Sequence, residues 1–168
     1  MIVYQENKTQ FLSDVRNDMI ETKIAARVLE KLHRHTSESE LRSWMNSMQY
    51  MYKVMEYEKI PNESKVAIEY QLPNTSKRID FLICGEDDTH RETAVIVELK
   101  QWDYLEKCPE QEAIVKTYLN GRLVKHDHPS YQAYSYQSFI EEYNESVRKH
   151  DILLKPCSYL HNYRLKNN

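Results

Sequence analysis

The stretch KRIDFLICGEDDTHRETAVIVELKQW, residues 77–102, decides the fold because it holds two apolar runs separated by a polar connection. RIDFLIC and AVIVELK are both apolar enough for the middle of a β-sheet, yet they carry Asp80, Glu98 and Lys100. Moving an ionised group out of water costs several kcal/mol unless it is paired, hydrogen-bonded or bound to a metal. These three side chains therefore need a compensating partner.

Alternation along the two runs predicts that the ionisable side chains meet. Successive side chains of a strand point to opposite faces, so Glu98 and Lys100 share one face of their strand. If RIDFLIC pairs with this strand, Asp80 can lie beside Glu98 across the ladder. Two carboxylates this close repel each other unless an oxygen-preferring cation neutralises them. We therefore expect Mg²⁺ or Mn²⁺ held by Asp80, Glu98 and the carbonyl of Leu99, with Lys100 orienting a metal-activated water. The alternative is a structural ion pair between Lys100 and either carboxylate at a half-exposed sheet edge.

The neighbouring runs predict a meander of strands. VAIEYQL alternates between apolar and polar residues, and a PNTS turn joins it to RIDFLIC, which continues the pattern. Weaker strand signals follow at AIVKTYL and GRLVKH. The apolar residues expected to share a face within their own strand are Val66, Ile68, Tyr70 and Leu72 in the first strand and Ile79, Phe81 and Ile83 in the second.

Helical periodicity flanks these strands. Residues 1–33 are expected to form an amphipathic helix, and a second helix begins at Ser37, with Glu40 completing a capping box. Pro129 opens a helix over YQAYSYQSFIEEYNESV, and the apolar tail DILLKPCSYL follows. The order of helices, strands and a further helix predicts an α/β sandwich or an α+β arrangement. A single domain spans 1–168, with a helical part over 1–60 and a sheet core with a C-terminal helix over 61–168.

Composition excludes several classes of protein. With 168 residues and a formal net charge of -3, the chain lacks the basic field of a protein that coats nucleic acid. Its 2 glycines provide no Gly-rich phosphate loop, which excludes a self-contained nucleoside triphosphatase. The 3 cysteines are widely spaced and are interpreted as free thiols of a reducing cytoplasm. No apolar run is long enough to predict a membrane span, and no signal peptide is visible.

The ionisable residues resemble a known motif. Asp80 in one strand, a hairpin, and Glu98-Leu99-Lys100 ending the next strand resemble the PD-(D/E)xK nuclease superfamily, whose members bind metal and activate water at these positions. Gln132 and Tyr136 fit the QxxxY signature of RecB-like members, and their four-residue spacing puts both on one helix face. The resemblance implies the α/β fold class with a restriction-endonuclease-like core, a mixed central β-sheet flanked by helices. It also implies that these two residues support the substrate. The alternative for the second motif is a surface helix in a Tyr-rich segment.

A longer resemblance covers nearly the whole chain. RSWMNSMQYMYKVM, AIEYQLPNTSKRIDFLICG, VIVELKQW and HPSYQAYSY are similar to the N-terminal region of Schlafen-like bacterial and phage DNA/RNA helicases. In that family a nuclease-like region precedes a P-loop motor, which implies a helicase motor as a partner in cis or in trans. No Walker motif follows residue 160, so helicase activity is not expected of this chain. A role in phage defence or phage replication is the implied biological context.

Superfamily members often add an acidic residue as a further metal ligand. Glu40 is one candidate, although the capping box already employs it, and Glu69 is favoured by the periodicity of its strand. Trp44 is expected in the core, His126 is expected in a loop, and Arg78 is expected to meet phosphate or solvent.

The expected function is that of a Mg²⁺- or Mn²⁺-dependent deoxyribonuclease acting on single- or double-stranded DNA, with RNA as the other substrate. The alternative is a catalytically inactive module that binds nucleic acid or protein and accompanies a helicase. No membrane partner is expected.

Overall fold

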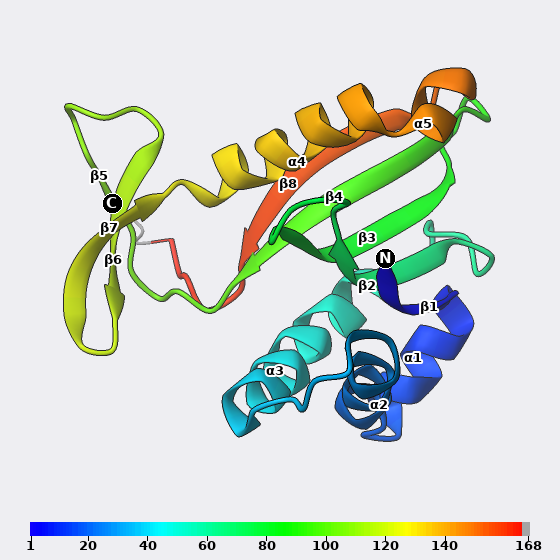
Figure 1. The fold of residues 1–168 in the computed structure, drawn as a ribbon, viewed down its shortest axis with the longest axis horizontal. Coiled ribbons are helices and arrows are strands. Elements are labelled where there is room, and N and C mark those ends of the chain that lie inside the picture. The colour runs from blue at the N-terminus through cyan, green and yellow to red at the C-terminus, as the bar shows by residue number, and fades with distance from the viewer. Residues whose placement is uncertain (166–168) are drawn as a thin grey trace.

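A computed structural model describes residues 1–165 as two β-sheets with helices packed around the larger one (Figure 1). The strands are β1 Ile2–Asn7, β2 Lys65–Gln71, β3 Arg78–Glu86, β4 Glu92–Lys100, β5 Glu106–Lys107, β6 Ile114–Leu119, β7 Arg122–Asp127 and β8 Leu153–Leu160. The helices are α1 Lys8–Arg16, α2 Ile20–Leu32, α3 Glu38–Met55, α4 Pro129–Tyr143 and α5 Glu145–Lys149. None of the helices in this part of the chain is both long and apolar enough to cross a membrane.

The larger sheet has the order β1-β2-β3-β4-β8 and is mixed. The predicted meander β2-β3-β4 is confirmed as antiparallel, whereas β8 pairs with β4 in parallel. The sequence predicted only an apolar tail where β8 lies. A parallel neighbour requires a long crossover, which the small sheet, α4 and α5 provide between β4 and β8.

Helices cover both faces of the larger sheet (Figure 1). On one face α1, α2 and α3 bury a core with β1 to β4, and on the other face α4 packs against β4 and β8. The first core includes Phe11, Ile24, Met48, Met51, Ile68 and Phe81, and the second includes Leu82, Ile96, Ala133, Tyr136 and Ile140. The α/β class with a helix-flanked mixed sheet is therefore confirmed.

The N-terminal part differs from the predicted single helix. Ile2–Asn7 is a strand that pairs with β2, and Asn7 then caps α1 by accepting a hydrogen bond of 2.8 Å from the N–H of Gln10. Asp18, with φ at 52°, separates α1 from α2. The prediction was wrong because the residues at the start of the chain are good strand formers that find an edge of the sheet to extend.

The prediction that the apolar residues of β2 share one face, and those of β3 another single face, is also wrong, because each set is divided between the two faces of the sheet. Ile68 and Phe81 pack against the helices α1–α3, but Tyr70 and Ile79 join the core under α4. The pairing register does not change, since Ile68 lies opposite Phe81 and Tyr70 opposite Ile79. On β2 the change of face falls at Glu69, whose φ of 55° is in the left-handed region. Positive φ in a residue other than glycine costs about 1–2 kcal/mol, so this position is strained.

The small sheet β5-β6-β7 projects from the body of the molecule (Figure 1). Its hairpin turns at Asn120 and Gly121, whose φ values of 51° and 75° match a type I′ turn. His128 then caps α4, with Pro129 in the first turn. The strands predicted at AIVKTYL and GRLVKH, the helix opened by Pro129 and the capping box of Ser37 are all confirmed.

Candidate active site

Asp80 and Glu98 face each other across β3 and β4. Phe81 pairs with Val97, and one residue further along the same antiparallel register brings Asp80 opposite Glu98. The N–H of Leu99 donates a hydrogen bond of 2.8 Å to Oδ2 of Asp80. In an antiparallel strand the N–H and C=O of one residue point to the same side, so the Leu99 carbonyl is also directed toward β3.

Lys100 neutralises part of the charge of this pair. Its Nζ lies 2.6 Å from Oε1 of Glu98, as expected for two residues on the same strand face, and the Glu98 side chain is only 2% exposed. The other oxygen of Glu98, Oε2, is buried without a hydrogen-bond partner. Lys100 therefore binds one oxygen of the buried Glu98 carboxylate, and the other oxygen can still accept a bond from another ligand.

The electrostatics of the pair favour the protonated form of Asp80 in the metal-free protein. Burial and, after it, the charge of Glu98 raise the pKa of the Asp80 carboxyl to about 8, against the opposing hydrogen bond from Leu99. Burial also raises the pKa of Glu98, and Lys100 counteracts this effect. The pair therefore keeps one proton, on Asp80, at neutral pH. A cation that binds both carboxylates can displace this proton.

The donor set fits a hard divalent cation. Asp80 and Glu98 offer carboxylate oxygens and Leu99 a carbonyl, which are the ligand types preferred by Mg²⁺ and Mn²⁺. Among residues 1–165 no group of three or more His, Cys, Asp and Glu side chains is arranged to hold a metal. An ion at this place would therefore depend on two carboxylates, backbone and water, a set that Mg²⁺ commonly accepts.

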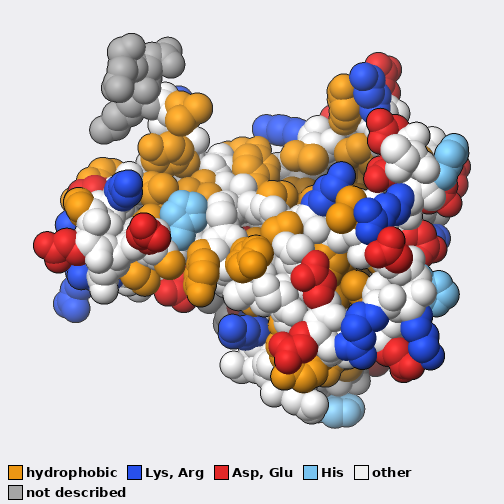
Figure 2. All heavy atoms as spheres, turned by 90° about the horizontal axis from the view of Figure 1, so that it is seen from above, with side chains coloured by type: hydrophobic (Ala, Val, Ile, Leu, Met, Phe, Trp, Pro, Cys, Tyr) orange, Lys and Arg blue, Asp and Glu red, His pale blue; other side chains and the backbone are white. Residues whose placement is uncertain are grey.

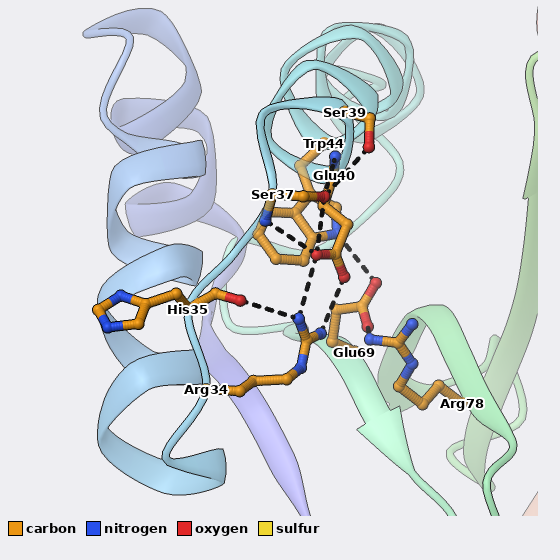
Figure 3. Close-up of polar contacts among 8 residues, drawn as sticks. All are labelled: Arg34, His35, Ser37, Ser39, Glu40, Trp44, Glu69 and Arg78. Atoms are coloured by element: carbon orange, nitrogen blue, oxygen red, sulfur yellow. Dashed lines mark hydrogen bonds and ion pairs between the residues drawn. The ribbon is translucent and has the colours of Figure 1, made fainter.

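Glu69, the favoured further ligand, is engaged by protein donors (Figure 3). Its Oε1 accepts a hydrogen bond of 2.9 Å from Nε1 of Trp44, and its Oε2 lies 2.6 Å from Nη1 of Arg78. The strained backbone at Glu69 places the carboxylate among these partners. Its charge nevertheless raises the pKa of Asp80 and Glu98, so Glu69 belongs to the electrostatic surroundings of the pair.

Glu40, the other candidate ligand, has a structural role (Figure 3). Arg34 donates to both of its carboxylate oxygens, at 2.9 and 3.1 Å, and the backbone N–H of Ser37 donates to one of them. The hydrogen bonds from Arg34 lower the pKa of Glu40 to about 2. Arg34 and the N–H of Ser37 thus compensate the Glu40 carboxylate at the start of α3 without a metal ion.

Gln132 and Tyr136 form one polar unit on α4. Nε2 of Gln132 donates a hydrogen bond of 2.6 Å to the hydroxyl oxygen of Tyr136, whose side chain is buried. Burial, together with the charges of Glu98 and Asp80 and against the hydrogen bond from Gln132, raises the pKa of Tyr136 to about 12. The unit therefore lies near the carboxylate pair, on the helix that packs against β4.

Two further residues complete one side of the site. Trp102 is buried, with Nζ of Lys100 at 5.6 Å from its ring centroid and the His126 ring at 5.0 Å. His126, expected in a loop, is on β7 and lowers the pKa of Glu98. No local pattern predicts this contact, because it depends on how the small sheet packs against the end of β4.

Comparison with protein-family models, with curated proteins and with solved structures finds no match to this chain. The site is therefore interpreted from its own geometry.

Proposed function

We propose that this chain is a metal-dependent nuclease domain with a restriction-endonuclease-like core that hydrolyses phosphodiester bonds in DNA. One observation carries the proposal: Asp80 and Glu98 face each other across two central strands, with Lys100 2.6 Å from Glu98. A carboxylate pair in this position destabilises the fold unless it is neutralised. A function that requires a bound cation explains why the pair is present.

The chain's own residues have distinct roles in this proposal. Asp80, Glu98 and the carbonyl of Leu99 would hold Mg²⁺ or Mn²⁺, which when bound acidifies a water and stabilises charge on the attacked phosphate. Lys100 holds the Glu98 carboxylate in place and offers its remaining protons to a water or phosphate oxygen. Gln132 and Tyr136 position the substrate from α4.

Cleavage assays test the proposal. Single-stranded DNA, double-stranded DNA and RNA are incubated with the protein in Mn²⁺ or in EDTA, and the variants Glu98→Gln and Lys100→Ala are compared with the wild type. We expect Mn²⁺-dependent cleavage of DNA that both variants lose by at least about 100-fold, the scale of a missing acid–base or charge-stabilising group. Glu92→Gln, an exposed carboxylate at the other end of β4, is the matched control and should retain activity. Cleavage that is unchanged in both Glu98→Gln and Lys100→Ala would refute the assignment.

A second candidate is a non-catalytic module that binds nucleic acid or protein and accompanies a helicase motor, in cis or in trans. The engagement of Glu40 and Glu69 by arginine and tryptophan donors favours it, because these donors already compensate both carboxylates without a metal. Titration with Mn²⁺ separates the two candidates. A binding module should show no saturable Mn²⁺ site that Glu98→Gln removes.

A further inference from the structure

Arg78 is held beside the carboxylate pair by an ion pair with Glu69. The register of β2 and β3 brings Glu69 opposite Asp80, with paired residues on both sides of them. Three carboxylates therefore lie in a row across β2, β3 and β4, and Glu69 is the first of them. Besides burial, the charge of Glu69 raises the pKa of both carboxyl groups of the pair, as expected for neighbours. Nη1 of Arg78 is 2.6 Å from Oε2 of Glu69, which puts the guanidinium at the end of this row.

The guanidinium of Arg78 is only partly engaged. Its side chain is 37% exposed, and its contact with Glu69 is an ion pair without hydrogen-bond alignment, since no described residue donates a hydrogen bond to Oε2 of Glu69. Within the part of the chain that the structure describes, this guanidinium has no further ion pair or hydrogen bond. A guanidinium presents five N–H donors in a planar fork, the geometry that binds phosphate. Arg78 therefore has donors to offer to an anion from solution.

Arg34, on the other side of the same cluster, is occupied by protein (Figure 3). Its Nη1 and Nη2 donate to the two carboxylate oxygens of Glu40, at 3.1 and 2.9 Å. Figure 3 shows Arg34 and Arg78 pointing toward the two glutamates from opposite sides. The fork of Arg34 is thus used inside the molecule, whereas the fork of Arg78 is not.

Trp44 and Glu69 keep the guanidinium of Arg78 in place. Nε1 of the buried Trp44 donates a hydrogen bond of 2.9 Å to Oε1 of Glu69, and the Glu69 side chain is itself buried. The left-handed backbone of Glu69 fits such a role, because strained residues are concentrated at ligand-binding sites. Glu69 therefore has a task that needs no metal, which is to anchor the arginine beside the pair.

Phosphate binding by this chain cannot depend on a broad basic surface. The formal net charge is -3. On the face that Figure 2 shows, Lys and Arg side chains lie among Asp and Glu side chains and do not form one basic field. Affinity for a polyanion must then come from individual contacts. A partly free arginine beside the carboxylate pair is well placed to make one of them.

We propose that Arg78 binds a backbone phosphate of the nucleic acid, with Glu69 and Trp44 as its positioning residues. This inference rests on the proposed function, since it takes nucleic acid as the substrate and names a group that holds it. Arg78 keeps its ion pair with Glu69 through Nη1 and donates from Nε and Nη2 to phosphate oxygens. Because the contact is with the backbone, it carries no preference for base sequence.

Fluorescence anisotropy in EDTA at low salt measures binding without cleavage, with a fluorescein-labelled oligodeoxythymidylate of about 20 nucleotides as the probe. We expect Arg78→Gln to weaken binding by about tenfold, the scale of one lost charge-assisted hydrogen bond. It should also reduce the slope of log affinity against log salt by about 0.7, as for one lost phosphate contact on a single strand. Arg78→Lys should keep that slope, because the phosphate charge is still neutralised.

Arg91→Gln is the matched control. Arg91 is 43% exposed and, like Arg78, is paired with one carboxylate, that of Asp151, but it lies beside the start of β4, away from the pair. Its replacement should change binding by less than about twofold and leave the salt slope as it is.

A double variant separates substrate binding from support of the fold. Arg78→Gln alone leaves the buried Glu69 carboxylate without its ion pair and should lower the melting temperature. Adding Glu69→Gln removes this unpaired charge, so the melting temperature should recover while binding stays weak. If the Gln variants do not fold, Arg78→Lys decides, since weaker binding with the wild-type slope supports the contact and a slope lowered by about 0.7 overturns it.

Several other results would overturn the inference. These are recovery of binding in the double variant, unchanged binding in Arg78→Gln, an equal effect of Arg91→Gln, and no binding of the probe by the wild type. Arg78-dependent binding without any Mn²⁺-dependent cleavage would refute the nuclease and leave this inference standing. Mn²⁺-dependent cleavage that Arg78→Gln leaves unchanged would do the reverse.

Discussion

Asp80→Asn should stabilise the metal-free protein, and the gain should increase with pH. In the wild type the Asp80 carboxyl lies opposite Glu98 and accepts a hydrogen bond from the N–H of Leu99. Asparagine keeps an oxygen for that N–H but never ionises. The substitution therefore removes the repulsion between the carboxylates and retains the backbone contact.

The magnitude follows from the pKa of Asp80, which burial and the charge of Glu98 raise from 3.8 to about 8. Each pH unit between the folded and unfolded pKa values corresponds to about 1.36 kcal/mol, so complete ionisation would cost roughly 6 kcal/mol. The side chain is partly exposed, and we halve the cost to about 3 kcal/mol for screening by water. The folded state binds the extra proton between these two pKa values. Wild-type stability, relative to the variant, is therefore unaffected below pH 3.8 and falls as pH rises toward about 8.

Urea unfolding in EDTA over a pH series from 4.5 to 9 measures this difference. Asp87→Asn is a contrasting control, because hydrogen bonds from Thr89 and Arg91 lower the pKa of Asp87 to about 2. That variant should be less stable than the wild type at neutral pH, and its deficit should disappear only in acid. If Asp80→Asn is no more stable than the wild type at pH 8.5, or if its advantage does not change with pH, the carboxylates do not repel each other as described.

Three further outcomes test the surroundings of the pair. Lys100→Met should lower the free energy of unfolding by about 3 kcal/mol because it leaves the buried Glu98 carboxylate unpaired, and adding Glu98→Gln should recover most of the loss in a double-mutant cycle. Glu40→Gln should cost about 1 kcal/mol at pH 7 through the loss of the Arg34 pair, and the difference should close as pH falls from 4.5 toward 2, where the wild-type carboxylate protonates. Mn²⁺ at about 100 times its dissociation constant should stabilise the wild type by about 2.7 kcal/mol in thermal unfolding and should leave Glu98→Gln unchanged.

Parts of the fold and site could be predicted from local sequence. Alternation within one strand puts Glu98 and Lys100 on the same face, and the structure joins them at 2.6 Å. The capping box at Ser37, the helix that begins at Pro129 and the strand meander also follow from patterns a few residues long. These features share a cause, since each depends on interactions between residues close in the chain.

Other features depend on partners that no local pattern identifies. β1 is a strand because it finds the edge of β2, and β8 becomes a parallel neighbour of β4 only through a crossover that contains α4. Glu69, whose carboxylate is bound by Trp44 and Arg78, has a left-handed backbone at the point where β2 departs from the alternation that the sequence predicts. Such contacts win over local preference because tertiary burial outweighs the 1–2 kcal/mol or so that a strained residue costs.

The sequence by itself therefore determined which ionisable side chains share a strand, where α3 and α4 begin, and that a central meander forms. Only the tertiary structure decided that Glu69 is bound by Trp44 and Arg78 and that the His126 ring lies against Trp102. The physical reason is the distance along the chain over which each interaction acts. Periodicity and capping act within a few residues, whereas the burial and charge that raise the pKa of Asp80 come from elements brought together by folding.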